Sequence, residues 1–322
     1  MSLLQVKNLV VEFAHRRGTL RALDDISFDI APGEILGVVG ESGAGKSLTG
    51  ASIIGLLEPP GRVASGQILL EGQRIDHLST DEMRHIRGRK IGAIFQDPLT
   101  SLNPLYTVGR QLTETIEAHL PVSRAQARQR AIELLQDTGI PAAEQRIDHY
   151  PHQFSGGMRQ RVVIALALAA EPQLIVADEP TTALDVSIQA QIISLLKKVC
   201  KDRGAAVMLI THDMGVIAET CDRVAVMYAG RIAEIGPVRQ VIEQPAHPYT
   251  RGLMACIPDM ASDRHKLNQI EGAMPRLNAI PAGCAFNPRC PQALDRCSRQ
   301  RPELMLAGAT QAACWLHEKV TA

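Results

Sequence analysis

The sequence has no excess of charge of either sign. Its 322 residues include 34 lysines and arginines and 34 aspartates and glutamates, so the formal net charge is zero. Proteins whose main partner is nucleic acid usually carry a basic surplus that neutralises phosphates. The charge balance therefore disfavours that class of function.

Long apolar runs are also missing. No stretch approaches the ~20 apolar residues that a membrane-spanning helix needs. The first residues, MSLLQVKNLVVEF, lack the charged start, apolar stretch and small-residue cleavage site of a secretory signal. We therefore expect a cytosolic protein, a reducing setting in which clustered cysteines more often bind a metal or do chemistry than form disulfides.

What is present is a pattern of short apolar segments separated by helix-length stretches. The segments ILGVVG, QLIVADE, AAVMLITHD and RVAVMYAGRI are typical of strands buried on both faces, which indicates an α/β fold. Helical spacing with polar faces predicts a helical subdomain at about residues 99–165. Proline and turn-forming residues become frequent beyond residue 240, so we predict two domains, 1–240 and 241–322.

The segment GESGAGKS, residues 40–47, fits the phosphate-binding pattern G-x-x-x-x-G-K-[ST] between a predicted strand and a predicted helix. Glycines allow several backbone N–H groups to point at one anion, and the helix N-terminus adds partial positive charge. Lys46 is expected to neutralise the β- and γ-phosphates, and the Ser47 hydroxyl to bind Mg²⁺. A glycine-rich turn that matches by chance is the alternative interpretation.

Two adjacent acids follow a predicted buried strand in LIVADE. Asp178 can hold Mg²⁺ directly or through water, and Glu179 can take a proton from an attacking water. Many strands end in an acid, so this signal gains weight only in combination with the phosphate-binding loop.

The segment FSGGMRQR opens a further predicted helix. Ser155 is placed as its N-cap, with Gly156 and Gly157 behind it, and such a helix start can bind a second anion. An ordinary helix start explains the same residues. Two phosphate-binding helix ends in one chain suggest two chains that face each other, each closing the other's loop.

In this order, the motifs resemble those of an ATP-binding cassette (ABC) nucleotide-binding subunit, over residues 3–240. The resemblance implies a P-loop fold with a mainly parallel core sheet, an antiparallel β subdomain and a helical subdomain. It matches Gln96 in IFQDP to the Q-loop, Ala183–Asp185 to the D-loop and His212 in LITHD to the switch histidine. Met158 departs from the family pattern, where glutamine is commonest.

The resemblance also implies the members of the site. Catalysis is expected from Lys46, Gln96, Glu179 and His212, and Mg²⁺ binding from Ser47, Gln96 and Asp178. Phe13 is the candidate for stacking on adenine. The residues expected to bind ATP are Phe13, Gly40, Ser42, Gly43, Gly45, Lys46, Ser47, Leu48, Gln96, Ser155, Gly156, Gly157, Asp178 and Asp185.

Four of the seven cysteines lie near the C-terminus: Cys284, Cys290, Cys297 and Cys314. No two of them have the C-x2-4-C spacing of a zinc pair, yet four thiolates suit zinc or an iron–sulfur cluster. The segment around them has few large apolar side chains, so a metal would stabilise a small accessory domain. An iron–sulfur cluster, zinc and metal-free thiols are the three interpretations.

The segments HPYTRGLM and GCAFNPRC resemble the tail of one ABC branch, the ATPase subunits of bacterial dipeptide and oligopeptide importers of the D-subunit type, with related nickel and glutathione importers. In that branch the four-cysteine tail is associated with a [4Fe–4S] cluster, so the resemblance implies that cofactor beside ATP and Mg²⁺.

The leading hypothesis is an ATPase subunit that powers peptide import. The resemblance implies two membrane-spanning permease subunits, a homologous second ATPase, an external peptide-binding protein that acts indirectly, and a position on the cytoplasmic face of the bacterial inner membrane. A nickel or glutathione importer, a soluble ABC ATPase outside transport and a non-hydrolysing partner subunit are the alternatives.

Overall fold

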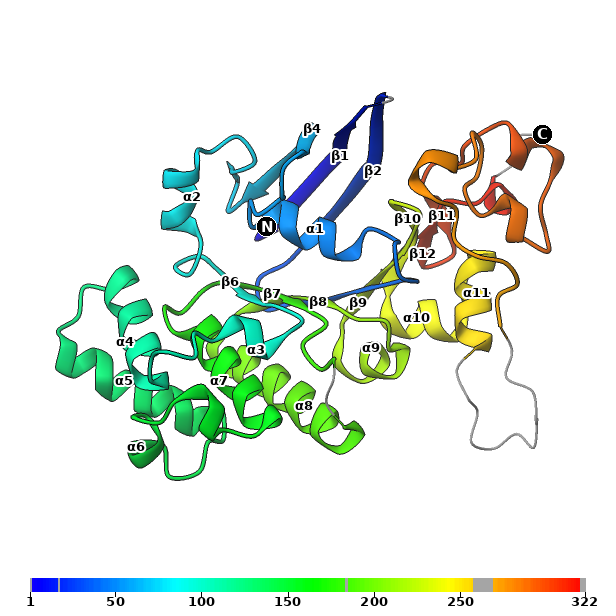
Figure 1. Ribbon diagram of the computed structural model, residues 1–322. Coiled ribbons are helices and arrows are strands. Elements are labelled where there is room, and N and C mark those ends of the chain that lie inside the picture. The colour runs from blue at the N-terminus through cyan, green and yellow to red at the C-terminus, as the bar shows by residue number, and fades with distance from the viewer. Residues whose placement is uncertain (1, 17, 183–184, 257–268, 319–322) are drawn as a thin grey trace. The chain divides into compact units, whose positions relative to one another are not determined.

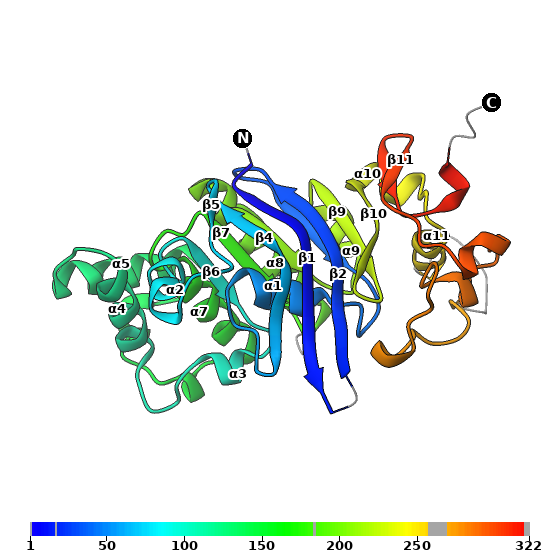
Figure 2. The same cartoon turned by 90° about the horizontal axis from the view of Figure 1, so that it is seen from above.

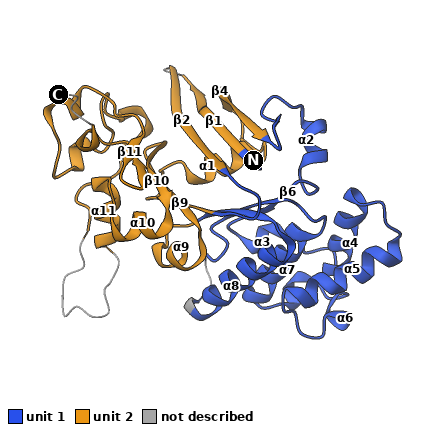
Figure 3. Ribbon diagram, turned by 180° about the vertical axis from the view of Figure 1, so that it is seen from behind, with its two compact units in different colours: residues 1–4, 30–35, 70–210 blue, residues 5–29, 36–69, 211–322 orange. Residues whose placement is uncertain are grey.

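The computed structural model describes residues 2–16, 18–182, 185–256 and 269–318. Two compact units make up the chain, as Figure 3 shows. Unit 1 contains residues 1–4, 30–35 and 70–210, and unit 2 contains residues 5–29, 36–69 and 211–322. The chain therefore crosses between the units several times, and segments far apart in the sequence share a unit.

Unit 1 contains three parallel strands in the order β8-β7-β6: β6 (Ile91–Ile94), β7 (Leu174–Asp178) and β8 (Ala206–Ile210). Ile91 is level with Leu174, and Asp178 with Ile210. Every residue of β8 and all of β7 except Asp178 are buried, as expected for apolar strands covered on both faces. Asp178 thus lies at the carboxyl end of the sheet.

The helices of unit 1 are mostly consecutive between β6 and β7, and Figure 1 shows α4 to α7 gathered in one part of the unit. Ser123 and Gln126 form a capping box at the start of α5, which explains why the helix begins there. The helical elements are α2 (Thr80–Ile86), α3 (Pro98–Ser101), α4 (Val108–His119), α5 (Arg124–Asp137), α6 (Ala143–Arg146), η1 (Pro151–Gln153), α7 (Gly156–Leu168) and α8 (Val186–Arg203); β5 (Gln73–Arg74) is a short strand.

Unit 2 contains strands of two sheets. Figure 2 shows β1 (Leu4–His15), β2 (Gly18–Ile30) and β4 (Gly61–Leu70) side by side, in the order β2-β1-β4. The other sheet has the order β11-β12-β10-β9-β3 in this unit. Its β3 (Ile35–Val39) and β9 (Arg223–Tyr228) are parallel, whereas β10 (Arg231–Pro237), β12 (Thr310–Ala312) and β11 (Met305–Ala307) pair antiparallel.

The last third of unit 2 is built from short helices around that sheet. β12 pairs with β10, so the chain's final segment belongs to the same sheet as β9 and β3. A separate accessory domain is therefore not confirmed, and the boundary near residue 240 stays a prediction. The helical elements of unit 2 as a whole are α1 (Lys46–Ile53), α9 (Met214–Thr220), α10 (Val238–Glu243), α11 (Pro248–Ala255), η2 (Leu277–Ala279), η3 (Asn287–Arg289), η4 (Asp295–Ser298) and η5 (Trp315–His317).

Glu234 in β10 anchors the segment that leads into α11. Its side chain is fully buried, and its two carboxylate oxygens accept hydrogen bonds from the N–H groups of Ala246 and His247, both at 2.9 Å. The hydroxyl of Thr310 donates to the same carboxylate at 3.1 Å. Buried N–H groups need such partners, so one side chain fixes both the approach to α11 and the start of β12.

His247 provides a pH-dependent contribution to stability. Burial lowers the pKa of His247 from 6.5 to about 4, although a backbone hydrogen bond with Ala313 opposes the shift, and its Nδ1 accepts a hydrogen bond from the Tyr249 N–H at 3.0 Å. Because protonation favours the unfolded chain, the stability present above pH ~6.5 is lost as the pH falls toward 4. We expect the free energy of unfolding to fall by about 2 kcal/mol between pH 7 and pH 5 from this group.

Urea unfolding at the two pH values measures that loss. A His247→Asn variant, which keeps a hydrogen-bond acceptor, should lose this part of the pH dependence, whereas replacing the exposed His77 by asparagine should leave it intact. An unchanged pH dependence in the His247 variant would contradict the assignment.

Candidate functional site

The segment Gly40–Ser47 forms a tight loop between β3 and α1 in unit 2. At Gly40 a Cβ would lie 2.2 Å from the carbonyl oxygen of Met227, so no other residue fits without a shift of the backbone. Gly45, the N-cap of α1, has a φ of 102°, a left-handed conformation that glycine adopts at little cost. The two motif glycines are thus required by the close approach of β9 and by the turn into the helix.

Lys46 and the start of α1 complete the loop. The Lys46 side chain is buried, and its Nζ donates to the carbonyl oxygens of Gly40 at 2.8 Å and Glu41 at 3.1 Å. No side chain forms a capping hydrogen bond at the start of α1. The loop residues Ser42, Gly43 and Ser47 are exposed. An uncapped helix start with an ammonium group beside it is the arrangement that binds phosphate. The residues present therefore fit a nucleotide phosphate chain.

Two other predicted members of the site lie in the same unit. The N–H of Thr211 donates a hydrogen bond to the carbonyl oxygen of Val38 in β3 at 3.1 Å, and β3 leads into the glycine loop. His212, the next residue after Thr211, is exposed. Phe13 is half-buried in β1, and a Cβ at Gly61 would come within 2.8 Å of its ring. The roles of His212 and Phe13 stay predictions.

The acidic pair lies in unit 1. Glu179 directly follows β7 with a φ of 45°, and its N–H donates to the carbonyl oxygen of Ile210 at 2.9 Å. Its Oε2 accepts hydrogen bonds from Gln96 Nε2 at 3.2 Å and from the Thr182 hydroxyl at 2.9 Å. The structure thus brings together Gln96 and Glu179, 83 residues apart, and holds the Glu179 carboxylate in a defined orientation.

The predicted second anion-binding helix start is also in unit 1. Ser155 is the N-cap of α7, and its side chain accepts a hydrogen bond from the Met158 N–H at 3.4 Å. Asp185 caps α8 in the same way, at 2.9 Å from the Ile188 N–H. A Cβ at Gly157 would approach Ile188 to 2.8 Å, so the two helix starts lie against each other. Ala183 of the predicted D-loop lies outside the described residues.

Comparisons with known proteins identify the arrangement. Residues 23–182 match the ABC transporter family, and residues 233–297 match the family described as oligopeptide/dipeptide transporter, C-terminal region. The dipeptide transport ATP-binding protein DppD of Escherichia coli K12 is 47% identical over 315 residues, covering 98% of this chain and 96% of DppD. This chain belongs to the ABC transporter family. It carries that family's ATPase domain together with the C-terminal region of oligopeptide and dipeptide transporters.

Other relatives agree with this assignment. The oligopeptide transport ATP-binding protein AppD of Bacillus subtilis 168 is 45% identical over 321 residues, covering 99% of this ABC protein and 98% of AppD. Among solved structures, a dimeric post-hydrolysis state of the ATP-binding cassette MJ0796 bound to ADP and Pi has a TM-score of 0.66 and 31% identity, covering 73% of this chain and 99% of that one. Within the described residues, no helix has both the length and the apolar character that crossing a membrane requires.

The cysteine prediction is wrong for this ABC protein. None of the seven cysteines forms a disulfide, and among the described residues no group of three or more His, Cys, Asp or Glu side chains is placed to hold a metal ion. Neither the predicted [4Fe–4S] cluster nor zinc at Cys284, Cys290, Cys297 and Cys314 is supported. Burial raises the pKa of the Cys284 thiol to about 11, with smaller contributions from the other three, so it is protonated at neutral pH.

Packing takes the place of the expected metal. Phe286 is 3% exposed, and its ring lies edge-on to Tyr228 at a centroid distance of 5.2 Å and tilted against Tyr249 at 5.4 Å. Cys297 and Cys314 are buried, and the Cys284 N–H donates to the carbonyl oxygen of Cys297 at 2.8 Å. The segment has few apolar side chains of its own because it covers apolar side chains that β9 and α11 supply.

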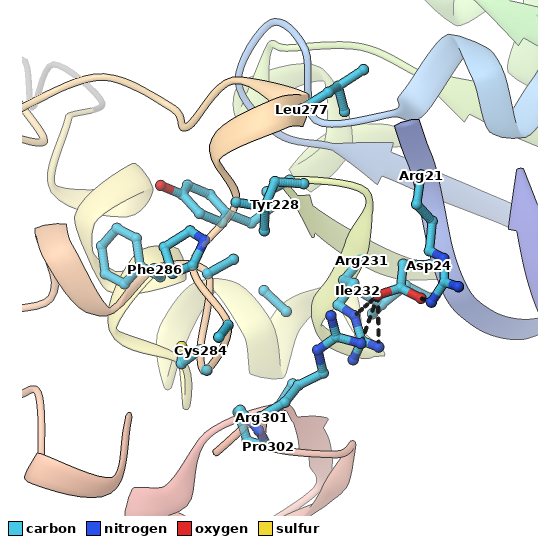
Figure 4. A pocket seen from close by; sticks show the side chains of 18 of the residues that line it. Arg21, Asp24, Tyr228, Arg231, Ile232, Leu277, Cys284, Phe286, Arg301 and Pro302 are labelled. Carbon is cyan, nitrogen blue, oxygen red and sulfur yellow. Dashed lines mark hydrogen bonds and ion pairs between the residues drawn. The ribbon is translucent and has the colours of Figure 1, made fainter. Parts of the chain in front are cut away.

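A cavity of about 480 Å³ in unit 2 lies outside the predicted site, and Figure 4 shows part of its lining. The buried Asp24 carboxylate forms three ion pairs there, with N–O distances of 3.0 Å to Arg21, 3.1 Å to Arg231 and 2.6 Å to Arg301. Burial alone would raise the pKa of Asp24, but the arginines outweigh it and lower the pKa below 3.8. This network ties β2, β10 and the C-terminal segment together.

Proposed function

We propose that this chain hydrolyses ATP to power the import of dipeptides and oligopeptides through membrane permease subunits. The observation that carries the proposal is the glycine loop at Gly40–Ser47, with its uncapped helix start and adjacent Lys46, in a chain whose relatives over almost its full length are dipeptide and oligopeptide transport ATP-binding proteins. Binding of a triphosphate is what this loop geometry favours.

Each residue has a role in this proposal. Lys46 exchanges its contacts with the carbonyls of Gly40 and Glu41 for phosphate oxygens and neutralises their charge. Ser47, Asp178 and Gln96 would hold Mg²⁺, which would neutralise charge at the phosphates when bound. Glu179, oriented by Gln96 and Thr182, accepts the proton of the attacking water.

The remaining members act at the γ-phosphate and between chains. His212 contacts the γ-phosphate as the switch histidine, and Phe13 stacks on adenine. Ser155, Gly156 and Gly157 bind the nucleotide that a facing ATPase subunit holds. Asp185 contributes to the same nucleotide-binding surface. The dimeric state of the cassette MJ0796 supports a paired arrangement. A homologous second ATPase is the proposed facing subunit.

The partners follow from the branch of the family. Two membrane-spanning permease subunits provide the pathway, an external peptide-binding protein delivers cargo to them, and this chain works at the cytoplasmic face of the inner membrane. The similarity to DppD and AppD, together with the matched C-terminal region, supports this assembly.

Uptake of radiolabelled dialanine by cells that carry a Lys46→Ala allele tests the function. We expect uptake to fall to the level of a gene deletion, because a missing ammonium group leaves the phosphates without their main counter-charge. The exposed Lys198→Ala in α8 is the matched control and should retain uptake. Normal ATP-dependent uptake in the Lys46 variant, with the protein present at normal abundance, would refute the proposal.

A further inference from the structure

The C-terminal region forms hydrogen bonds and an ion pair with Glu41 of the phosphate-binding loop. The N–H of Glu41 donates to the hydroxyl oxygen of Tyr249 at 2.9 Å. Nη1 of Arg289 lies 3.0 Å and 3.1 Å from the two carboxylate oxygens of Glu41. Glu41 follows the first glycine of the loop, and its partners lie 208 and 248 residues away in the sequence.

Both partners are held in place by other contacts. The Arg289 side chain is only 7% exposed, and its guanidinium also donates to the carbonyl oxygens of Glu271 at 2.9 Å and Ile270 at 3.3 Å, and to the Tyr228 hydroxyl at 3.3 Å. A guanidinium with several fixed acceptors has lost most of its side-chain freedom already. The ion pair with Glu41 is therefore little weakened by solvent or by side-chain motion.

Tyr249 is also held in place by its surroundings. Its ring is fully buried and lies edge-on to Tyr228 at a centroid distance of 4.6 Å. Its N–H donates to His247 Nδ1 at 3.0 Å, and the His247 N–H donates to Glu234 at 2.9 Å. A continuous set of contacts thus runs from β10, through the start of α11, to the backbone of the phosphate-binding loop.

Glu41 is also a hydrogen-bond partner of Lys46. The Glu41 carbonyl oxygen accepts a hydrogen bond from Lys46 Nζ at 3.1 Å, while the N–H of the same residue is held by Tyr249. Met274 of the C-terminal region also approaches the loop, 4.0 Å from where a Cβ at Gly43 would lie. The backbone that shapes the loop beside Lys46 is therefore restrained by the C-terminal region.

We propose that Tyr249 and Arg289 are positioning residues for nucleotide binding, a role that rests on the proposed function. By holding Glu41 they keep the loop in its phosphate-binding shape before ATP arrives, so that less ordering remains for the nucleotide to impose. The C-terminal region thus influences the affinity of the ATP site through Glu41.

MgATP titrations of the full chain, followed by calorimetry, test this role with three variants. Tyr249→Phe removes only the hydroxyl and should weaken MgATP binding about two- to tenfold. Arg289→Met should weaken it by about tenfold or more, because it removes the charge-assisted hydrogen bonds to Glu41, and Glu41→Gln, which loses the charge but keeps an acceptor oxygen, should weaken it by about two- to tenfold. The Glu41→Gln/Arg289→Met double variant should bind MgATP no more weakly than Arg289→Met alone, because Arg289→Met already removes the ion pair that Glu41→Gln changes.

The kinetic readout separates positioning from general damage. In ATPase assays of the assembled transporter, KM for ATP should rise while kcat at saturating ATP stays within about twofold, since Glu179 and Gln96 are untouched. Arg289→Lys, which keeps the charge, should restore part of the affinity. The matched control is Arg296→Met, which removes an arginine paired with Glu318 and stacked on Trp315 in the same region, and should leave MgATP affinity unchanged.

The outcomes are distinguishable. If the wild-type chain does not bind MgATP, the proposed function fails. If the wild type binds but Tyr249→Phe and Glu41→Gln bind within twofold of it, only the positioning role fails. If Arg289→Met does not fold, Tyr249→Phe decides, because it retains the buried ring and should melt within a few degrees of the wild type.

Discussion

Replacing Glu179 by glutamine is expected to slow ATP hydrolysis by ~10²–10⁴-fold while MgATP binding is retained. The amide has the same shape, and its oxygen can still accept the hydrogen bonds from Gln96 and Thr182 that orient the carboxylate. What is lost is the group that takes the proton from water. Phosphate release at saturating ATP and MgATP titration measure the two effects separately.

The matched control for that experiment is Glu133→Gln, an exposed carboxylate on α5 that should leave turnover unchanged. Near-normal hydrolysis by the Glu179 variant would remove the residue from its assigned role. Loss of MgATP binding would instead show that its carboxylate shapes the nucleotide site.

Glu234→Ala is expected to have the largest effect on stability, lowering the free energy of unfolding by about 2–6 kcal/mol. The substitution leaves the buried N–H groups of Ala246 and His247 without an acceptor, and each such loss costs about 1–3 kcal/mol. Glu234→Gln keeps one acceptor oxygen and should lie between the alanine variant and the wild type.

Urea unfolding followed by the fluorescence of Trp315 measures this effect where it should occur. Trp315 is the one tryptophan of the sequence, and its indole N–H donates to the carbonyl oxygen of Gln300 at 3.0 Å within the C-terminal region. The control Glu243→Ala removes an exposed carboxylate that pairs with Arg239 on α10, and should cost less than about 0.5 kcal/mol. Equal unfolding midpoints for the Glu234 and Glu243 variants would refute the anchoring role.

The phosphate-binding loop could be predicted from the sequence because the turn into its helix is a local constraint. Gly45 is required by the left-handed backbone at the start of α1, so the spacing of residue types carries that part of the geometry, whereas Gly40 is required by the close approach of Met227 in β9, which no local pattern states. The apolar strands β7 and β8 are likewise buried on both faces, as their composition indicates. Ser155 forms the N-cap that the pattern predicts.

The predicted cysteine cluster is wrong because a single sequence shows the tail without the surface that it covers. Few apolar side chains near Phe286 suggested that a metal must stabilise it, whereas the structure places that ring against Tyr228 and Tyr249, which are distant in the sequence. No pattern in a single sequence states which distant surface a short segment will cover. The contacts of Glu41 with Tyr249 and Arg289 were missed for the same reason.

Strand β10 has a consequence for how this protein can diverge. It pairs with β9 on one side and with β12 on the other, and the family match of the C-terminal region begins within it, at residue 233. A recombination junction at that point would split a strand and separate Glu234 from the residues it anchors or from its own sheet. Exchange of the tail at that point would therefore leave one edge of β10 unpaired, so the tail and the edge of the sheet depend on each other structurally.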